Sequence, residues 1–153
     1  MSKVDHHYTE CGLMNVFISG IEVQVDDDGD EIITIPAVNE LHRVIAEGIV
    51  SHPKGMSGDE LRFLRTEMGL TQAELAQYVH RDKQAIGRWE RGEFELDSSA
   101  EALIRRMAIE KLKLTDELGI DELSKRSVPS AQPQTIKISK VNNDNHTYEL
   151  DAA

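Results

Sequence analysis

The stretch TQAELAQYVHRDKQAIGRWERG, residues 71–92, decides the fold of the central part of this 153-residue chain. Thr71 is followed three residues later by Glu74, the pattern of a capping box, in which each side chain bonds a backbone N–H that the first turn of a helix leaves unpaired. The apolar residues that follow recur at helical spacing: Leu75, Ala76 and Val79. We therefore predict a helix that begins near Gln72.

A second helix is predicted after a short polar break. Asp82 is placed to cap its N-terminus through a side-chain oxygen, and Ile86 and Trp89 form its apolar face. Its outward face carries basic and amide side chains, with one arginine before it and one at its end: Lys83, Gln84, Arg88, Arg81 and Arg91. Two short helices joined by a tight turn, the second with such a face, are typical of a DNA-binding helix-turn-helix.

These side-chain types match the chemistry of B-DNA. In the major groove Gln pairs with the edge of adenine, and Lys or Arg reaches the two acceptors of guanine. Residues near the N-terminus of a recognition helix lie closest to the bases, so we predict that Lys83 and Gln84 read bases from a recognition helix over about residues 82–91. Gln72, in the first turn of the preceding helix, is predicted to hold a phosphate. The predicted DNA-binding set is Gln72, Arg81, Lys83, Gln84, Arg88 and Arg91.

Through TQAELA, the position of Ile86 and the RWERG ending, this segment resembles the Cro and phage-repressor type of domain, often called the Xre family. The resemblance implies a five-helix domain over residues 56–113 that usually binds operator DNA as a dimer and represses transcription. The family usually has Gly in the turn, where this chain has His80, and an apolar residue where it has Arg81. Because His tolerates a positive φ better than most residues, we expect the turn to survive.

Other residues of the segment are assigned to packing or to solvent. The apolar side chains are expected to form the core because their spacing buries one helix face. Isolated surface charges need no special role, so we expect solvated helix faces for four arginines: Arg62, Arg65, Arg105 and Arg106. Gly87, inside the second helix, is either a tolerated substitution or a point where the backbone approaches DNA closely.

Residues 1–55 are predicted to form a small α+β unit. Strand-like alternation over residues 15–25 is interrupted by DDDGD and resumes as EIITIP, which predicts a β-hairpin. The apolar residues of VNELHRVIAEGIV then share one helical face. A hairpin and one helix bury too little apolar surface to be stable alone, so we expect this unit to pack on the helical domain or to form a dimer or partner surface.

Capping boxes at Ser57 with Glu60 and at Ser98 with Glu101 are predicted to open the first and last helices of residues 56–113. A helical extension is predicted over residues 114–127, followed by a linker and a β arm in residues 128–153. This last segment has two alternating runs, which fit a hairpin, an arm that pairs with a partner's edge strand, or a disordered tail. We favour the arm. The predicted fold is mainly α, a five-helix Cro/repressor-like domain with an N-terminal β-hairpin and helix and a C-terminal β arm.

Acidic side chains exceed basic ones and give a formal net charge of −11. Nonspecific affinity for nucleic acid comes from phosphate neutralisation, so this charge argues against indiscriminate binding. Most of the acidity lies in residues 1–55 and 114–153, and residues 81–91 keep a local excess of basic groups. Specific binding to double-stranded operator DNA by a homodimer is therefore the expectation.

Several classes of protein are excluded by the residues. Cys11 is the single cysteine, so no intrachain disulfide is possible, and no apolar run resembles a membrane span or a signal peptide. We therefore expect a cytoplasmic protein. His6, His7 and Cys11 lack a fourth metal ligand, and DDDGD lacks the spacing of a calcium loop. No catalytic constellation is present, so we expect no enzyme activity, no cofactor and no metal.

Two functional classes fit the sequence. The first is a transcriptional repressor that regulates its own promoter, and the second is an antitoxin of a type II toxin–antitoxin pair that also neutralises a toxin protein. The helix-turn-helix resembles those of HigA-type and MqsA-type antitoxins, although the CxxC zinc ligands of the MqsA type are missing, and the acidic flanks suit a basic toxin. A protein-only interaction module is a third class, against which the basic and amide side chains of the second helix argue.

Overall fold

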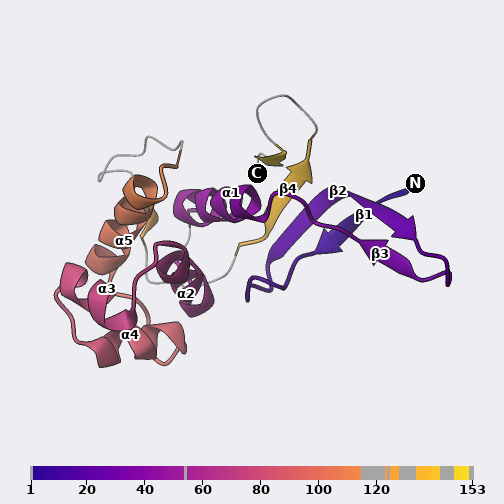
Figure 1. Cartoon of the computed structure of the whole chain (residues 1–153). Helices are drawn as coiled ribbons and strands as arrows, with labels where there is room; N and C mark the ends of the chain where they lie inside the picture. The colour runs from indigo at the N-terminus through magenta and orange to yellow at the C-terminus, as the bar shows by residue number, and fades with distance from the viewer. Residues whose placement is uncertain are drawn as a thin grey trace.

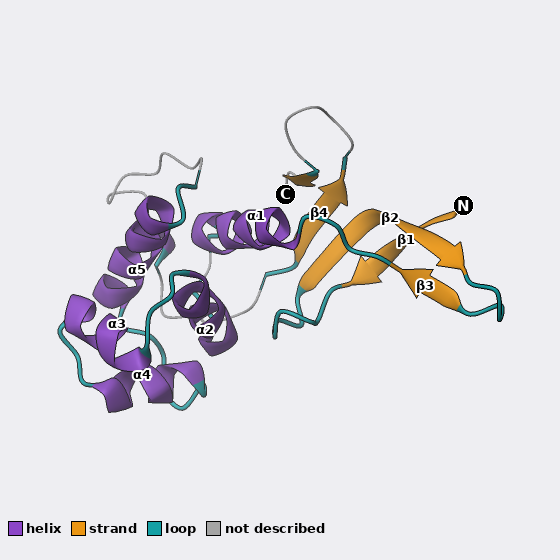
Figure 2. Cartoon of the chain, in the orientation of Figure 1, coloured by secondary structure: helices purple, strands orange, loops and turns teal. Residues whose placement is uncertain are grey.

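The computed structural model describes residues 2–53, 55–114, 123, 125–127, 134–141 and 147–151. In these ranges a small five-stranded sheet lies on one side of the molecule and the helices lie on the other (Figures 1 and 2). The order of elements is β1 (Ser2–His7), β2 (Val16–Val25), β3 (Glu31–Ile33), α1 (Val38–Ser51), α2 (Gly58–Glu67), α3 (Gln72–Val79), α4 (Lys83–Glu90), α5 (Ser98–Lys111), β4 (Ile136–Lys140) and β5 (Tyr148–Leu150).

The starts of α2, α3 and α4 confirm the predicted caps. Ser57 and Thr71 each accept a bond from the backbone N–H three residues on, and Glu60 and Glu74 bond back to the cap N–H groups. Asp82 accepts from the Ala85 N–H at 2.8 Å. These bonds satisfy N–H groups that have no partner inside the helix.

The capping box predicted at Ser98 and Glu101 is wrong. The residue before them, Asp97, is the N-cap of α5 and accepts from the Ala100 N–H at 3.3 Å. The Glu101 carboxylate is buried and accepts instead from the backbone N–H of Met56. An aspartate is a strong N-cap and its charge suits a helix N-terminus, so the helix starts at Ser98, the residue that we expected to be the cap.

The five-helix expectation for residues 56–113 is also wrong in its boundaries. Only four helices, α2 to α5, lie in that range, which is described throughout. The remaining helix is α1, which we assigned to the N-terminal unit and which packs against both α2 and α5. Its apolar residues also cover β4 and β5, so it joins the helices to the sheet (Figure 1). Periodicity showed that α1 has an apolar face but not which surfaces that face covers.

The sheet is built around β2. The predicted hairpin is present: β2 pairs antiparallel with β3 across a turn in which Asp26 Oδ1 accepts from the N–H groups of Asp28 and Asp30. The second strand is shorter than expected and ends at Ile33. The segment β1 adds a third antiparallel strand to β2.

The C-terminal segment is a hairpin of the sheet of its own chain, not an arm reaching for a partner. The strand β4 pairs parallel with β2, with Ile136 opposite Val16, and β5 pairs antiparallel with β4. Ile136, Ile138 and Tyr148 are buried. Burial of their apolar surface within the chain stabilises this pairing. The predicted linker before it, and most of the predicted helical extension, lie outside the described residues, although Leu123, Lys125 and Arg126 are helical.

Candidate nucleic-acid interface

The turn between α3 and α4 has the backbone that the sequence predicted. His80 ends α3 with φ 56° and ψ 44°, in the left-handed region. The N–H of His80 bonds the Ala76 carbonyl, and the N–H of Arg81 bonds the same oxygen at 3.0 Å. His80 thus has a left-handed backbone conformation that Gly adopts without steric cost. The two hydrogen bonds to the Ala76 carbonyl hold the turn in this conformation.

The helix α4 has one packed face and one open face. Ile86 and Trp89 are buried, which confirms their assignment to the core. Lys83 and Gln84, in the first turn, are exposed. Their side chains form no hydrogen bond or ion pair with any residue that the structure describes. The two side chains are therefore available to a partner outside the chain.

The three arginines of the predicted set have contacts at the surface. Arg81 pairs with Asp97 at 2.9 Å, and Arg91 pairs with Glu93 at 3.1 Å. The Arg88 guanidinium lies 5.8 Å from the centroid of the Phe94 ring. Exposed ion pairs contribute about 0–1 kcal/mol, so the pairs of Arg81 and Arg91 can be broken at little cost.

Gln72 lies at the N-terminus of α3, but its amide faces the protein. It is half-buried, and its Nε2 donates to Glu90 Oε1 at 3.1 Å. Gly87 lies beneath it: a Cβ at Gly87 would be 3.1 Å from Arg91 Nη1 and 3.6 Å from Gln72 Oε1. The close approach that the structure shows at this glycine is therefore to side chains of the same domain.

Glu90 joins three helices and was missed from sequence. Its side chain is fully buried, and Arg65 donates to both carboxylate oxygens, at 2.6 and 3.0 Å. The expectation of a solvated side chain is therefore wrong for Arg65, which is 16% exposed, whereas Arg62 is 56% exposed with its Nε 3.4 Å from Glu90 Oε1. Burial raises the pKa of Glu90, but the hydrogen bonds from Arg65 and Gln72 outweigh it and the net pKa is lowered. The signal in the sequence was the spacing of Glu90, four residues after the core residue Ile86.

Arg105 is a second arginine whose predicted exposure is wrong. It is fully buried, and its Nη1 donates to the carbonyls of Val50 at 3.0 Å and His52 at 2.8 Å. These carbonyls belong to the end of α1, where a cation complements the helix dipole. Glu101 lies 3.5 Å away, and burial lowers the pKa of Arg105 and raises that of Glu101. The remaining arginine, Arg106, is half-buried and pairs with Glu110.

The comparisons with known proteins agree with this geometry. Residues 61–103 match the model of the helix-turn-helix family. The match runs from within α2 to within α5 and contains α3, the turn and α4. No curated protein and no solved structure matches the chain. None of the helices in the described ranges is long and apolar enough to cross a membrane. Residues 61–103 therefore match a helix-turn-helix domain of the Xre/Cro-like type, within a longer chain.

Proposed function

We propose that this protein is a sequence-specific transcriptional repressor that inserts α4 into the major groove of operator DNA as a homodimer. One observation carries the proposal. Lys83 and Gln84 project from the first turn of the helix-turn-helix's second helix, exposed and without partners among the described residues, while the opposite face of that helix is buried. A side chain that is held on a rigid helix and makes no hydrogen bond within the protein can form hydrogen bonds with the edge of a base.

The roles of the surrounding residues follow from their contacts. Lys83 and Gln84 read bases. Arg81, Arg88 and Arg91 move from their surface partners to phosphates and set the register without reading sequence. Gln72 contributes its backbone N–H at the start of α3 to a phosphate, while its amide stays on Glu90 and holds α3 against α4.

Dimerisation follows from the size of the reading element. The helix α4 has eight residues, and its first turn reaches only a few base pairs. Two copies related by a two-fold axis would read two half-sites about 34 Å apart, so the operator is an inverted repeat. Because the net charge is −11, specific contacts from both copies are needed to hold the protein on DNA at physiological salt. We propose that the operator lies upstream of the protein's own gene.

The test is a gel shift at physiological salt with the DNA upstream of the gene. Wild type is compared with Lys83→Ala/Gln84→Ala and with the matched control Lys3→Ala/Gln24→Ala, which removes the same charge and amide from exposed positions on the sheet. We expect the first variant to lose affinity by roughly 1–3 kcal/mol per reading residue and the control to bind like wild type. Equal losses in both variants would remove the basis of the proposal.

A second titration on random DNA separates base reading from phosphate binding. Lys83→Ala should weaken operator binding far more than binding to random DNA. Arg81→Ala should weaken both and reduce the dependence on salt concentration, because it removes one phosphate contact. If Lys83→Ala weakens both DNAs alike, Lys83 is a phosphate contact and not a base reader.

One feature favours the second candidate, an antitoxin. The β2–β3 hairpin lies away from the helix-turn-helix (Figure 1), and its acidic turn is flanked by exposed apolar residues: Val25, Ile32 and Ile33. An acidic and apolar surface suits a basic protein partner. The test is co-expression with the product of the neighbouring gene. Relief of growth arrest by wild type and by Lys83→Ala/Gln84→Ala, but not by Asp27→Lys/Asp28→Lys, would support this function, and no relief by any form would exclude it.

A further inference from the structure

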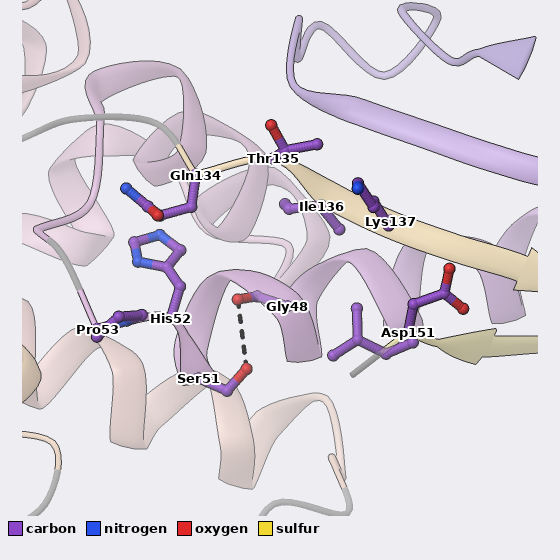
Figure 3. A pocket seen from close by; sticks show the side chains of 10 residues that line it. Gly48, Ser51, His52, Pro53, Gln134, Thr135, Ile136, Lys137 and Asp151 are labelled. Atoms are coloured by element: carbon purple, nitrogen blue, oxygen red, sulfur yellow. Dashed lines mark hydrogen bonds between the residues drawn. The ribbon is translucent and has the colours of Figure 1, made fainter. Parts of the chain in front are cut away.

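A pocket of about 500 Å³ lies outside the helix-turn-helix domain. Its walls are the last turn of α1 with the two residues that follow it, the start of β4, and the end of β5 (Figure 3). It thus lies where the C-terminal hairpin meets the helix that packs on α2 and α5. Its volume is in the range of pockets that take small molecules, about 300–1,000 Å³.

One buried polar atom in this pocket lacks a partner. His52 is 7% exposed, and its Nδ1 has no hydrogen-bond partner among the described residues. The other ring nitrogen, Nε2, lies 3.3 Å from Glu60 Oε2. The two Glu60 oxygens also accept N–H bonds from Ser57 and Asn15. Because Nε2 is paired with Glu60, Nδ1 is the ring nitrogen left for a partner, and in the tautomer that donates from Nε2 to Glu60 it is an acceptor.

The pocket has an apolar middle between polar ends. Ile136 and Leu150 form apolar walls, and Gly48 has no side chain between them: a Cβ there would be 3.0 Å from Ile136 Cγ2 and 3.3 Å from Leu150 Cδ1. In Figure 3 the His52 imidazole lies at one end, and Asp151 lies at the other. Asp151 already accepts a bond from the Ser139 hydroxyl at 2.6 Å. The buried polar atom without a partner is therefore at the His52 end.

We propose that this pocket binds a small, mainly apolar molecule whose single N–H or O–H group donates to His52 Nδ1. The apolar body fills the space between α1 and the β4–β5 hairpin, and the donor satisfies an acceptor that is otherwise buried without a partner. A buried acceptor without a donor is unfavourable, so the donor distinguishes this ligand from apolar molecules of the same shape.

The wall of the pocket is tied to the DNA-binding domain. Glu60, which His52 contacts, belongs to the capping box of α2. Arg105 of α5 donates to the His52 carbonyl at 2.8 Å. An occupant of the pocket therefore stabilises the position of α1 against both helices. Binding itself is measured without DNA, so its test does not depend on the proposed function.

The test compares indole, which has one N–H donor, with benzofuran, which has the same shape and an oxygen in place of that N–H. Each is titrated into the full chain and followed by ligand-observed NMR. We expect indole to bind about tenfold more tightly, the ratio that corresponds to ~1.4 kcal/mol. Equal affinities, or no saturable binding of indole at millimolar concentration, would overturn the proposal.

Two variants locate the site. Ser51→Phe fills the pocket without touching Glu60 and should abolish indole binding, whereas Ser99→Phe, at an exposed position of α5, should leave it unchanged. His52→Phe should make indole and benzofuran bind equally. Thermal melting checks that each variant folds, and Ser51→Phe decides the question if His52→Phe does not fold. Undiminished indole binding by folded Ser51→Phe would place the ligand elsewhere and overturn the proposal.

Discussion

The packing of α4 against two other helices depends on Glu90. Its buried carboxylate accepts from Arg65 of α2 and from Gln72 of α3, and so holds both helices to α4. Glu90→Gln leaves Arg65, which is 16% exposed, without its counter-charge. Because a charge left unpaired on removal of its partner is costly, we expect a loss of roughly 3 kcal/mol in the free energy of unfolding. Urea denaturation followed by Trp89 fluorescence measures it.

The matched control is Glu93→Gln, which removes the same charge three residues along the chain. Its partner Arg91 is 56% exposed and Glu93 is 52% exposed, so the control should cost less than about 1 kcal/mol. Similar losses in the two variants would show that the Glu90 network contributes no more to stability than a surface pair does.

The lowered pKa of Glu90 makes this contribution depend on pH. A carboxyl whose folded-state pKa lies below its unfolded value stabilises the fold above that unfolded value, here 4.5, and loses the contribution as pH falls through the folded value. Wild type should therefore lose more stability than Glu90→Gln as pH falls below 4.5. Glu101 has a raised pKa, which acts in the opposite direction but equally in both proteins. Urea midpoints across the acid range give the comparison, and parallel curves would contradict the assignment.

At the scale of single residues, the sequence predicted the contacts between residues that are close in the chain. The caps at Ser57, Thr71 and Asp82 involve atoms within four residues, so composition and spacing were enough. Glu90 is 25 residues from Arg65, and the α1 carbonyls that Arg105 contacts are more than 50 residues from it. Charge alone does not distinguish a buried arginine from a solvated one. The prediction of the α5 cap was wrong for another reason. Asp97 and Ser98 are both good N-cap residues, and the sequence does not rank two adjacent candidates.

Among the helices, the contact between the start of α2 and the end of α4 has the least room. A Cβ at Gly58 would lie 2.4 Å from the Trp89 carbonyl oxygen and 2.5 Å from that of Glu90. Gly58→Ala must therefore push α2 away from α4. Overpacking costs about 1–3 kcal/mol and Ala gains up to about 1 kcal/mol in helix propensity, so we expect a net loss of about 2 kcal/mol, with weaker operator binding because α4 is displaced. Thermal unfolding and the gel shift measure the two effects.

The control for this contact is Asp59→Ala, at the next residue of α2, which is exposed. It should cost less than about 1 kcal/mol, through lost interaction with the helix dipole, and leave operator binding unchanged. A Gly58→Ala protein as stable as wild type would mean that α2 and α4 separate freely, contrary to the tight packing seen here.

Element order was easier to predict than element placement. The helix-turn-helix and the first hairpin follow from periodicity and turn residues, and both are present. The parallel pairing of β2 with β4 joins residues about 120 positions apart, with Val16 opposite Ile136. Short alternating runs fit an added strand, a partner's edge or a tail equally well, and the choice depends on the edge of β2 opposite β1, where β4 pairs. The role of α1 as the link between the sheet and the helices could not be predicted either, because it depends on contacts with elements far away in the chain.

At the scale of the whole molecule, the sheet and the helix-turn-helix share one hydrophobic core through α1. We therefore expect them to unfold together. Ile138→Ala, at a fully buried position of β4, should cost about 2–5 kcal/mol. Trp89, the only tryptophan, lies in α4 and reports on the helix-turn-helix. In a single cooperative unit its fluorescence transition should shift as far as the circular dichroism transition of the whole chain.

The control is Lys137→Ala, at the exposed neighbouring position of the same strand, which should move neither transition. If Ile138→Ala shifts only part of the circular dichroism change and leaves the Trp89 transition in place, the sheet is an independent unit attached to the DNA-binding domain. Coincident shifts would mean that a change in the sheet 49 residues from Trp89 in the chain alters the stability of α4. The pocket between α1 and the β4–β5 hairpin would then lie inside the same cooperative unit as α4, so that a ligand bound there would stabilise both.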